Sequence, residues 1–163
     1  MDDVSPLPYV EVGKLMGMLV YLEDIDGRGD IYAIASDMES EVDEIIPLIK
    51  VAEALGFAIV IEGDLVLTEL GKTLVMGDEN KRKIMFKKSI KKLPIFKKII
   101  DILEVTPDNS ISKNKLLDVL TSEMSEEEAQ THLKSIIELG RYAELIGYNP
   151  EDKEIYLDKL EEE

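Results

Sequence analysis

The stretch Ser40–Met76, SEVDEIIPLIKVAEALGFAIVIEGDLVLTELGKTLVM, decides the fold. Ser40 has the chemistry of a helix N-cap, and the carboxylates after it suit the positive end of a helix dipole. The apolar spacing predicts a helix to Leu55, with Gly56 as its C-terminal stop. Two short apolar runs flank Glu62-Gly63-Asp64 and predict a β-hairpin, which a further short helix follows. Helix, hairpin and helix occur in this order in a winged helix.

Two more helices are predicted ahead of this stretch, over residues 10–24 and 30–38, with Asp30 as the N-cap of the second. The short turn before the helix at Ser40 fits a helix-turn-helix arrangement. Gly13 and Gly17 lie four residues apart on the first helix, and we expect them to pack closely against a neighbouring helix.

The second half of the chain repeats this pattern in outline after a boundary at residues 77–80. Ser125 and Glu128 form a capping-box pattern, and Gly140 is the expected stop of the helix that they open. The predicted helices cover 81–92, 95–104, 113–121 and 125–139, and the predicted hairpin follows over 142–157. We therefore expect a mainly α fold with small β-hairpins (α+β). It contains two winged-helix-like units in tandem, as domains 1–78 and 79–163.

Composition narrows the classes of function. The 163 residues are 45% apolar and contain no cysteine, so a core is expected while disulfides and thiolate metal sites are excluded. No apolar run is long enough to span a membrane, and residues 1–6 lack the form of a signal peptide, so we expect a cytoplasmic location. The net charge of −16 argues against binding to nucleic acid or to an anionic membrane.

One segment departs from the acidic balance. Residues 81–98 hold nine of the nineteen basic residues and no acid, which leaves a charge of −25 for the rest of the chain. On a helical wheel the apolar residues Met85, Phe86, Ile90 and Leu93 share one side, and the other side carries Lys83, Lys87, Lys88, Lys91 and Lys92. This basic amphipathic pattern fits a solvated face that offsets nearby acid. It also fits contact with an acidic protein or a second copy of the chain, with nucleic acid or with a membrane surface.

The charge of the helix before each hairpin bears further on binding to nucleic acid. In many winged helices this helix enters the DNA groove. Helix 41–55 carries four acidic residues against Lys50, and helix 125–139 carries four against Lys134. The two hairpin tips are also acidic. None of these elements offers the arginine or lysine that base edges and phosphates require, so DNA binding through them is unlikely on chemical grounds.

The chain has no recognisable catalytic constellation. His132 is its single histidine and lies in a predicted acidic helix, where we expect a pH-sensitive surface residue. There is no phosphate-binding G-x-x-x-x-G-K-[ST] loop and no nucleophile elbow. We therefore expect a protein that is not an enzyme and that holds no metal or cofactor.

Six stretches in order, with Tyr148 after them, carry a resemblance: VGKLMGML (12–19), GDIYAIA (29–35), VDEIIPLI (42–49), AEALGFA (52–58), GDLVLTELG (63–71) and GRYAEL (140–145). Together they resemble the AAA-associated C-terminal domain family, which commonly follows the ATP-binding part of ABC transporters of the nitrate/sulfonate/taurine type. The resemblance implies an accessory domain attached to, or acting with, a transport ATPase. It supplies no catalytic residues. Arg141 and Tyr142 are its most distinctive residues, in either a structural or a contact role.

The sequence thus favours a non-enzymatic accessory or regulatory protein-interaction module that acts in trans on a protein partner, for which an ABC-type ATPase is the candidate, or that associates with itself. The candidate partner-binding residues are Lys83, Lys87, Lys88, Lys91, Lys92, Arg141 and Tyr142. One alternative is a winged-helix transcription regulator that binds nucleic acid through residues 81–98. A second alternative is a small-molecule sensor.

Overall fold

A computed structural model of the chain describes residues 6–158. These residues pack as two compact units, one formed by Val10–Met85 and the other by residues 6–9 together with 86–158. The chain therefore starts in the second unit, crosses into the first, and returns to the second at Phe86. The division into domains at residue 78 stays a prediction, and each unit is described here by itself.

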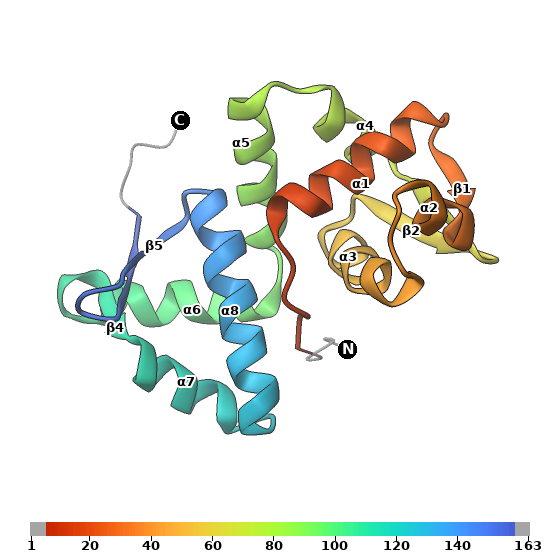
Figure 1. Cartoon of the computed structure of the whole chain (residues 1–163). Helices are drawn as coiled ribbons and strands as arrows, with labels where there is room; N and C mark the ends of the chain where they lie inside the picture. The colour runs from red at the N-terminus through yellow and green to blue at the C-terminus, as the bar shows by residue number, and fades with distance from the viewer. Residues whose placement is uncertain (1–5, 159–163) are drawn as a thin grey trace. The chain divides into compact units, whose positions relative to one another are not determined.

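The first unit contains three helices, a hairpin and a further helix, with one short strand between the first two helices (Figure 1). In order they are α1 (Val12–Asp24), β1 (Arg28–Asp30), α2 (Ile31–Asp37), α3 (Val42–Leu55), β2 (Ala58–Ile61), β3 (Asp64–Leu67) and α4 (Glu69–Met76). Helix α5 (Glu79–Ile90) then leads out of the unit.

The three strands form an antiparallel sheet in the order β1-β3-β2. Ile61 pairs with Asp64 at the end of the hairpin, and Glu62 and Gly63 between them have φ values of 52° and 84°. Two successive residues with positive φ make the tight turn whose twist suits a hairpin. The hairpin predicted around Gly63 is confirmed. The sequence did not indicate β1, which forms by pairing Gly29 with Leu65.

Helix α3 begins and ends on local signals. Its N-cap is Glu41 rather than the predicted Ser40, and the backbone N–H of Glu41 donates to Oε1 of Glu44 at 2.8 Å. Gly56 closes the helix with φ 84°, which confirms the predicted stop. Asp30 caps α2 as predicted, because its carboxylate accepts the backbone N–H of Ala33 at 2.9 Å.

The second unit repeats the succession of the first from its first helix to its hairpin, and within residues 6–158 no helix follows that hairpin. Its elements are α6 (Pro94–Val105), a short 3-10 turn (Pro107–Asn109), β4 (Ser110–Ser112), α7 (Lys113–Thr121), α8 (Glu126–Tyr142), β5 (Ile146–Asn149) and β6 (Glu154–Leu157). Their sheet has the antiparallel order β4-β6-β5, which matches the first sheet strand for strand. The chain is therefore mainly α with small β-hairpins, built as two winged-helix-like units in tandem.

Helix α8 ends three residues later than predicted. Ser125 and Glu128 do form its capping box, with both hydrogen bonds at 3.1 Å. The expected stop at Gly140 is wrong, because α8 continues to Tyr142. A Cβ at Gly140 would lie 2.5 Å from Cγ1 of Ile146, so glycine is needed there for close packing on β5 and not for helix termination.

Each unit has its own apolar core, which burial from water stabilises. Fully buried side chains of the first unit include Leu15, Met18, Leu19, Leu22, Phe57, Leu65 and Leu74. Those of the second include Phe86, Phe96, Leu103, Leu116, Ile136, Leu139 and Ile155. The close packing expected at Gly13 and Gly17 is wrong, since both are exposed and a Cβ there meets nothing within 4 Å.

Arg82 joins α5 to the end of α4. Its guanidinium donates to the backbone carbonyl of Val75 at 2.7 Å and to that of Leu74 at 3.3 Å. These carbonyls belong to the last turn of α4, where helix carbonyls lack an i+4 donor, and the carbonyl of Leu74 also accepts the backbone N–H of Gly77 at 3.2 Å. Arg82 is therefore a helix C-cap supplied by the following helix, in a part-buried position.

The glycines predict opposite responses to alanine. In Gly71→Ala the new Cβ would lie 2.0 Å from the carbonyl oxygen of Phe57, so we expect a loss of about 3 kcal/mol of unfolding free energy. In Gly17→Ala the Cβ meets open space within a helix, so we expect a gain of up to about 1 kcal/mol. Urea denaturation measures both, and a Gly17→Ala variant that is less stable than wild type would contradict the assignment of an open face.

Substitution of Arg82 is expected to lower stability more than substitution of a nearby exposed lysine. We expect Arg82→Ala to lose about 2 kcal/mol of unfolding free energy, because two helix-end carbonyls lose a charged donor. Lys88→Ala removes an exposed cation from the same helix and serves as the matched control, with an expected change within about 0.5 kcal/mol. Urea denaturation of the two variants is the measurement, and equal losses would show that Arg82 does not act as a cap.

Candidate functional site

The basic segment, residues 81–98, covers nearly all of α5, a turn at 91–93 and the start of α6. Phe86 and Ile90 of α5 are fully buried, and so is Phe96 of α6, whereas Met85 and Leu93 are part-buried. The apolar side predicted on the helical wheel therefore faces protein. The lysines lie on the remaining, solvent-directed side, and Pro94 opens α6 at a position where its missing N–H costs nothing.

The five predicted lysines do not form one equivalent set. Lys88, Lys91 and Lys92 are exposed, whereas Lys83 and Lys87 are half-buried and have contacts of their own. Lys83 also belongs to the first unit, while the others belong to the second. The candidate site therefore loses Lys83 and Lys87 as freely available cations.

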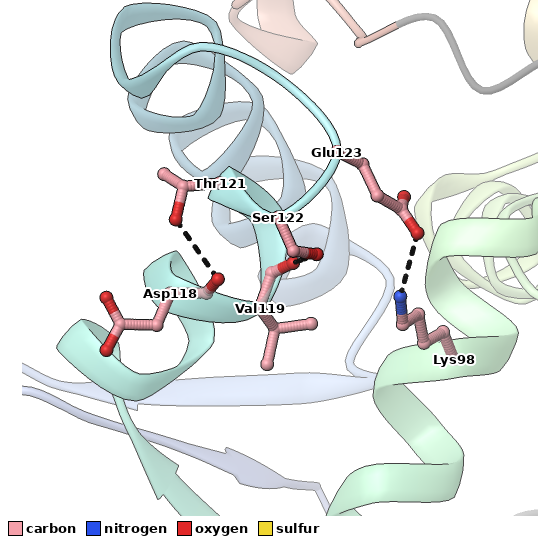
Figure 2. Close-up of polar contacts among 6 residues, drawn as sticks. All are labelled: Lys98, Asp118, Val119, Thr121, Ser122 and Glu123. Atoms are coloured by element: carbon pink, nitrogen blue, oxygen red, sulfur yellow. Dashed lines mark hydrogen bonds and ion pairs between the residues drawn. The ribbon is translucent and has the colours of Figure 1, made fainter.

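Two lysines of α6 lie close by in sequence, and they differ in their surroundings. Lys98 donates to Oε2 of Glu123 at 3.3 Å, an exposed ion pair that ties α6 to the connection between α7 and α8 (Figure 2). In the same view the hydroxyls of Thr121 and Ser122 turn back onto carbonyls of α7 and close its last turn. Lys97 is exposed and makes no salt bridge with any residue of the described part, 6–158.

Four lysines thus remain available to a partner, and we call Lys88, Lys91, Lys92 and Lys97 the exposed lysine set. None of them forms a salt bridge within residues 6–158. They lie within ten residues of one another, in a segment without any acidic residue. Helix α6 has no acid in its first turn and no side-chain N-cap, so the positive end of its dipole adds to their charge. The result is a local positive surface on a chain of net charge −16.

Arg141 and Tyr142 lie at the end of α8. The ring of Tyr142 meets the ring of Phe86 edge to face, with centroids 4.9 Å apart and planes at 75°. Tyr142 therefore packs the end of α8 against α5, the helix that carries Lys88 of the exposed lysine set. Arg141 is exposed in the last turn of α8, where a cation suits the helix dipole.

The helices that would enter DNA in a winged helix present acid to solvent. On α3 and its cap, Glu41, Asp43, Glu44 and Glu53 are exposed, and at the start of α8 so are Glu126, Glu127 and Glu128. Both hairpin tips carry exposed carboxylates as well, at Glu62 and at Glu151 and Asp152. These acids oppose contact with phosphate at both helix–hairpin surfaces.

His132 is not the surface residue that the sequence suggested. It is 3% exposed, and its Nδ1 accepts the backbone N–H of Leu7 at 3.0 Å. Burial lowers the pKa of His132 below its ordinary value of 6.5. The periodicity of α8 could have indicated this burial, since His132 is followed by buried Leu133 and Ile136. No pattern in the sequence indicates that His132 accepts a hydrogen bond from Leu7, which lies 125 residues away.

Two searches of the described residues, 6–158, gave negative results. No group of three or more histidine, cysteine or acidic side chains in that part of the chain could hold a metal ion. No helix within the same residues has the length and apolar character that crossing a membrane requires.

Comparison with known proteins gives one match. No curated protein and no solved structure is similar to the chain. The family model described as C-terminal AAA-associated domain matches residues 32–149, which is more than half of the chain and covers parts of both units. The chain therefore belongs to the C-terminal AAA-associated domain family.

Proposed function

We propose that this protein is a non-enzymatic accessory module that binds an acidic surface of a protein partner through the exposed lysine set. The partner that its family favours is a transport ATPase of the ABC type, and the module acts on it in trans in the cytoplasm. The observation that carries the proposal is the separation of four unpaired lysines from a surface that is otherwise acidic.

Charge complementarity is the physical basis of this proposal. Lys88, Lys91 and Lys92 lie within five consecutive residues, at the end of α5 and in the turn after it, so a single acidic patch on a partner can meet all three. Such pairing accelerates encounter and selects against partners with the same charge. The acidic remainder of the chain repels other polyanions, which directs binding to the lysines alone.

A protein surface fits these lysines better than nucleic acid does. Duplex binding needs cations at the elements that follow the groove, and α3, α8 and both hairpin tips present carboxylates there. The histidine that could have served in catalysis is engaged within the fold, because His132 accepts a hydrogen bond from Leu7. Both observations support a binding role without catalysis.

The direct test reverses the charge of the exposed lysine set. The matched control changes Lys14, Lys50, Lys72 and Lys115 to Glu, four exposed lysines elsewhere, so both variants differ from wild type by the same net charge. Binding to purified ABC-type ATPase subunits of the source organism is measured by biolayer interferometry at several salt concentrations. We expect the lysine-set variant to bind at least about tenfold more weakly than the control, and wild-type binding to weaken as salt rises.

Three results would contradict the proposal. Equal losses in the two variants would show a dependence on net charge and no defined site. Wild-type protein that binds none of the ATPase subunits would exclude this class of partner. Retention of duplex DNA by wild type at low salt, lost in the lysine-set variant, would assign the lysines to nucleic acid instead.

A further inference from the structure

The N-terminal strap, Pro6-Leu7-Pro8-Tyr9, is the unexpected feature of the fold. It precedes the first helix of the first unit but packs with the second unit, whose other described residues begin at Phe86. Leu7 is 9% exposed, so its side chain is inserted into the protein. A segment at one end of the sequence thus completes the surface of α8 near the other end.

The two prolines limit the backbone hydrogen bonds that the strap can donate. Proline has no backbone N–H, so Leu7 carries the only backbone donor within residues 6–8. That donor goes to Nδ1 of His132 at 3.0 Å. The two prolines also restrict the free segment to extended conformations, which lowers the entropy lost when it docks.

A second contact holds the strap two residues further on. The ammonium of Lys134 lies 4.5 Å from the centre of the Tyr9 ring, within the range of a cation–π interaction. An imidazole is the side chain that ordinarily titrates near neutral pH. The hydrogen bond to His132 is therefore an attachment of the strap that acid can break.

Protonation of His132 would act directly on this bond. Nδ1 can accept the Leu7 N–H only while it carries no proton, which places the ring proton on Nε2. A proton added to Nδ1 would face the N–H of Leu7, and the new cation would be buried at 3% exposure. Both effects favour departure of the strap.

We propose that residues 6–9 form an acid-released latch on α8, which is closed while His132 is neutral and opens when His132 gains a proton. Opening uncovers the part of α8 that Leu7 covers. The latch uses none of the exposed lysine set, so it stands independently of the proposed partner.

Among residues 6–158, no hydrogen bond or ion pair joins His132 to a charged side chain. On α8 itself the charged residues nearest in sequence are Glu128, which accepts the Ser125 N–H, and Lys134, which lies over Tyr9. Helix α7, which packs against α8, carries Lys113, Lys115 and Asp118 on its exposed side. Burial is the sole cause of the lowered pKa of His132, so the latch opens below pH 6.5 and is closed at neutral pH.

The test uses the absence of tryptophan from the chain. Tyr9→Trp introduces a single fluorophore at the contact with Lys134, and its emission reports whether the strap is docked. We expect emission to shift to longer wavelength in a one-proton transition as pH falls from 7.5 to 5.5. His132→Asn in the same background keeps a neutral acceptor that does not titrate, so we expect no transition there.

Two measurements on proteins without the fluorophore complete the experiment. Hydrogen exchange of the Leu7 amide, followed by NMR on wild type, should be at least about tenfold less protected at pH 5.5 than at pH 7.5 once intrinsic rates are removed. The folded pKa of His132 is lowered, so its stabilising effect is complete above pH 6.5 and is lost progressively as pH falls below that value. Urea midpoints should fall across this range in wild type and stay level in His132→Asn.

The outcomes that overturn the latch are equally definite. An emission transition of the same midpoint in His132→Asn would assign it to another group. A Leu7 amide whose protection is the same at both pH values would show that the strap stays docked when His132 titrates.

Discussion

In each half of the chain a glycine lets a helix touch the start of the hairpin, and the position of the wing depends on that contact. Gly71 of α4 brings the helix against the carbonyl of Phe57, just before β2, and Gly140 of α8 lies against Ile146, the first residue of β5. A side chain at either position would push the hairpin off the helix. Two different helices make this contact in the two units, so the same architecture is reached by two packing solutions.

The elements that could be predicted from sequence are those specified by neighbouring residues. The turn at Glu62 and Gly63 and the caps at Asp30, Ser112 and Ser125 all depend on contacts within a few residues, and each lies where its local chemistry indicates. Such features need no knowledge of the rest of the chain.

The elements that were missed depend on distant residues. Strands β1 and β4 are three residues long and exist because β3 and β6 offer edges for pairing, which no pattern within Arg28–Asp30 or Ser110–Ser112 reveals. Gly140 has the appearance of a helix stop, yet its role is fixed by Ile146. The candidate site shows the same division. The basic amphipathic segment was evident, but the use of Arg82 as a cap and of Lys98 in an ion pair needed the structure.

The crossing of the chain from the second unit to the first has a consequence for biosynthesis. Residues 6–9 leave the ribosome ahead of the unit formed by 10–85, but the helix that receives them is made more than one hundred residues later. The unit formed by 10–85 can fold during synthesis, while Leu7 stays exposed to solvent until α8 has been made. The second unit is complete only when residues 6–9 meet α8, so anything fused before Pro6 is attached to the unit that is completed later in synthesis.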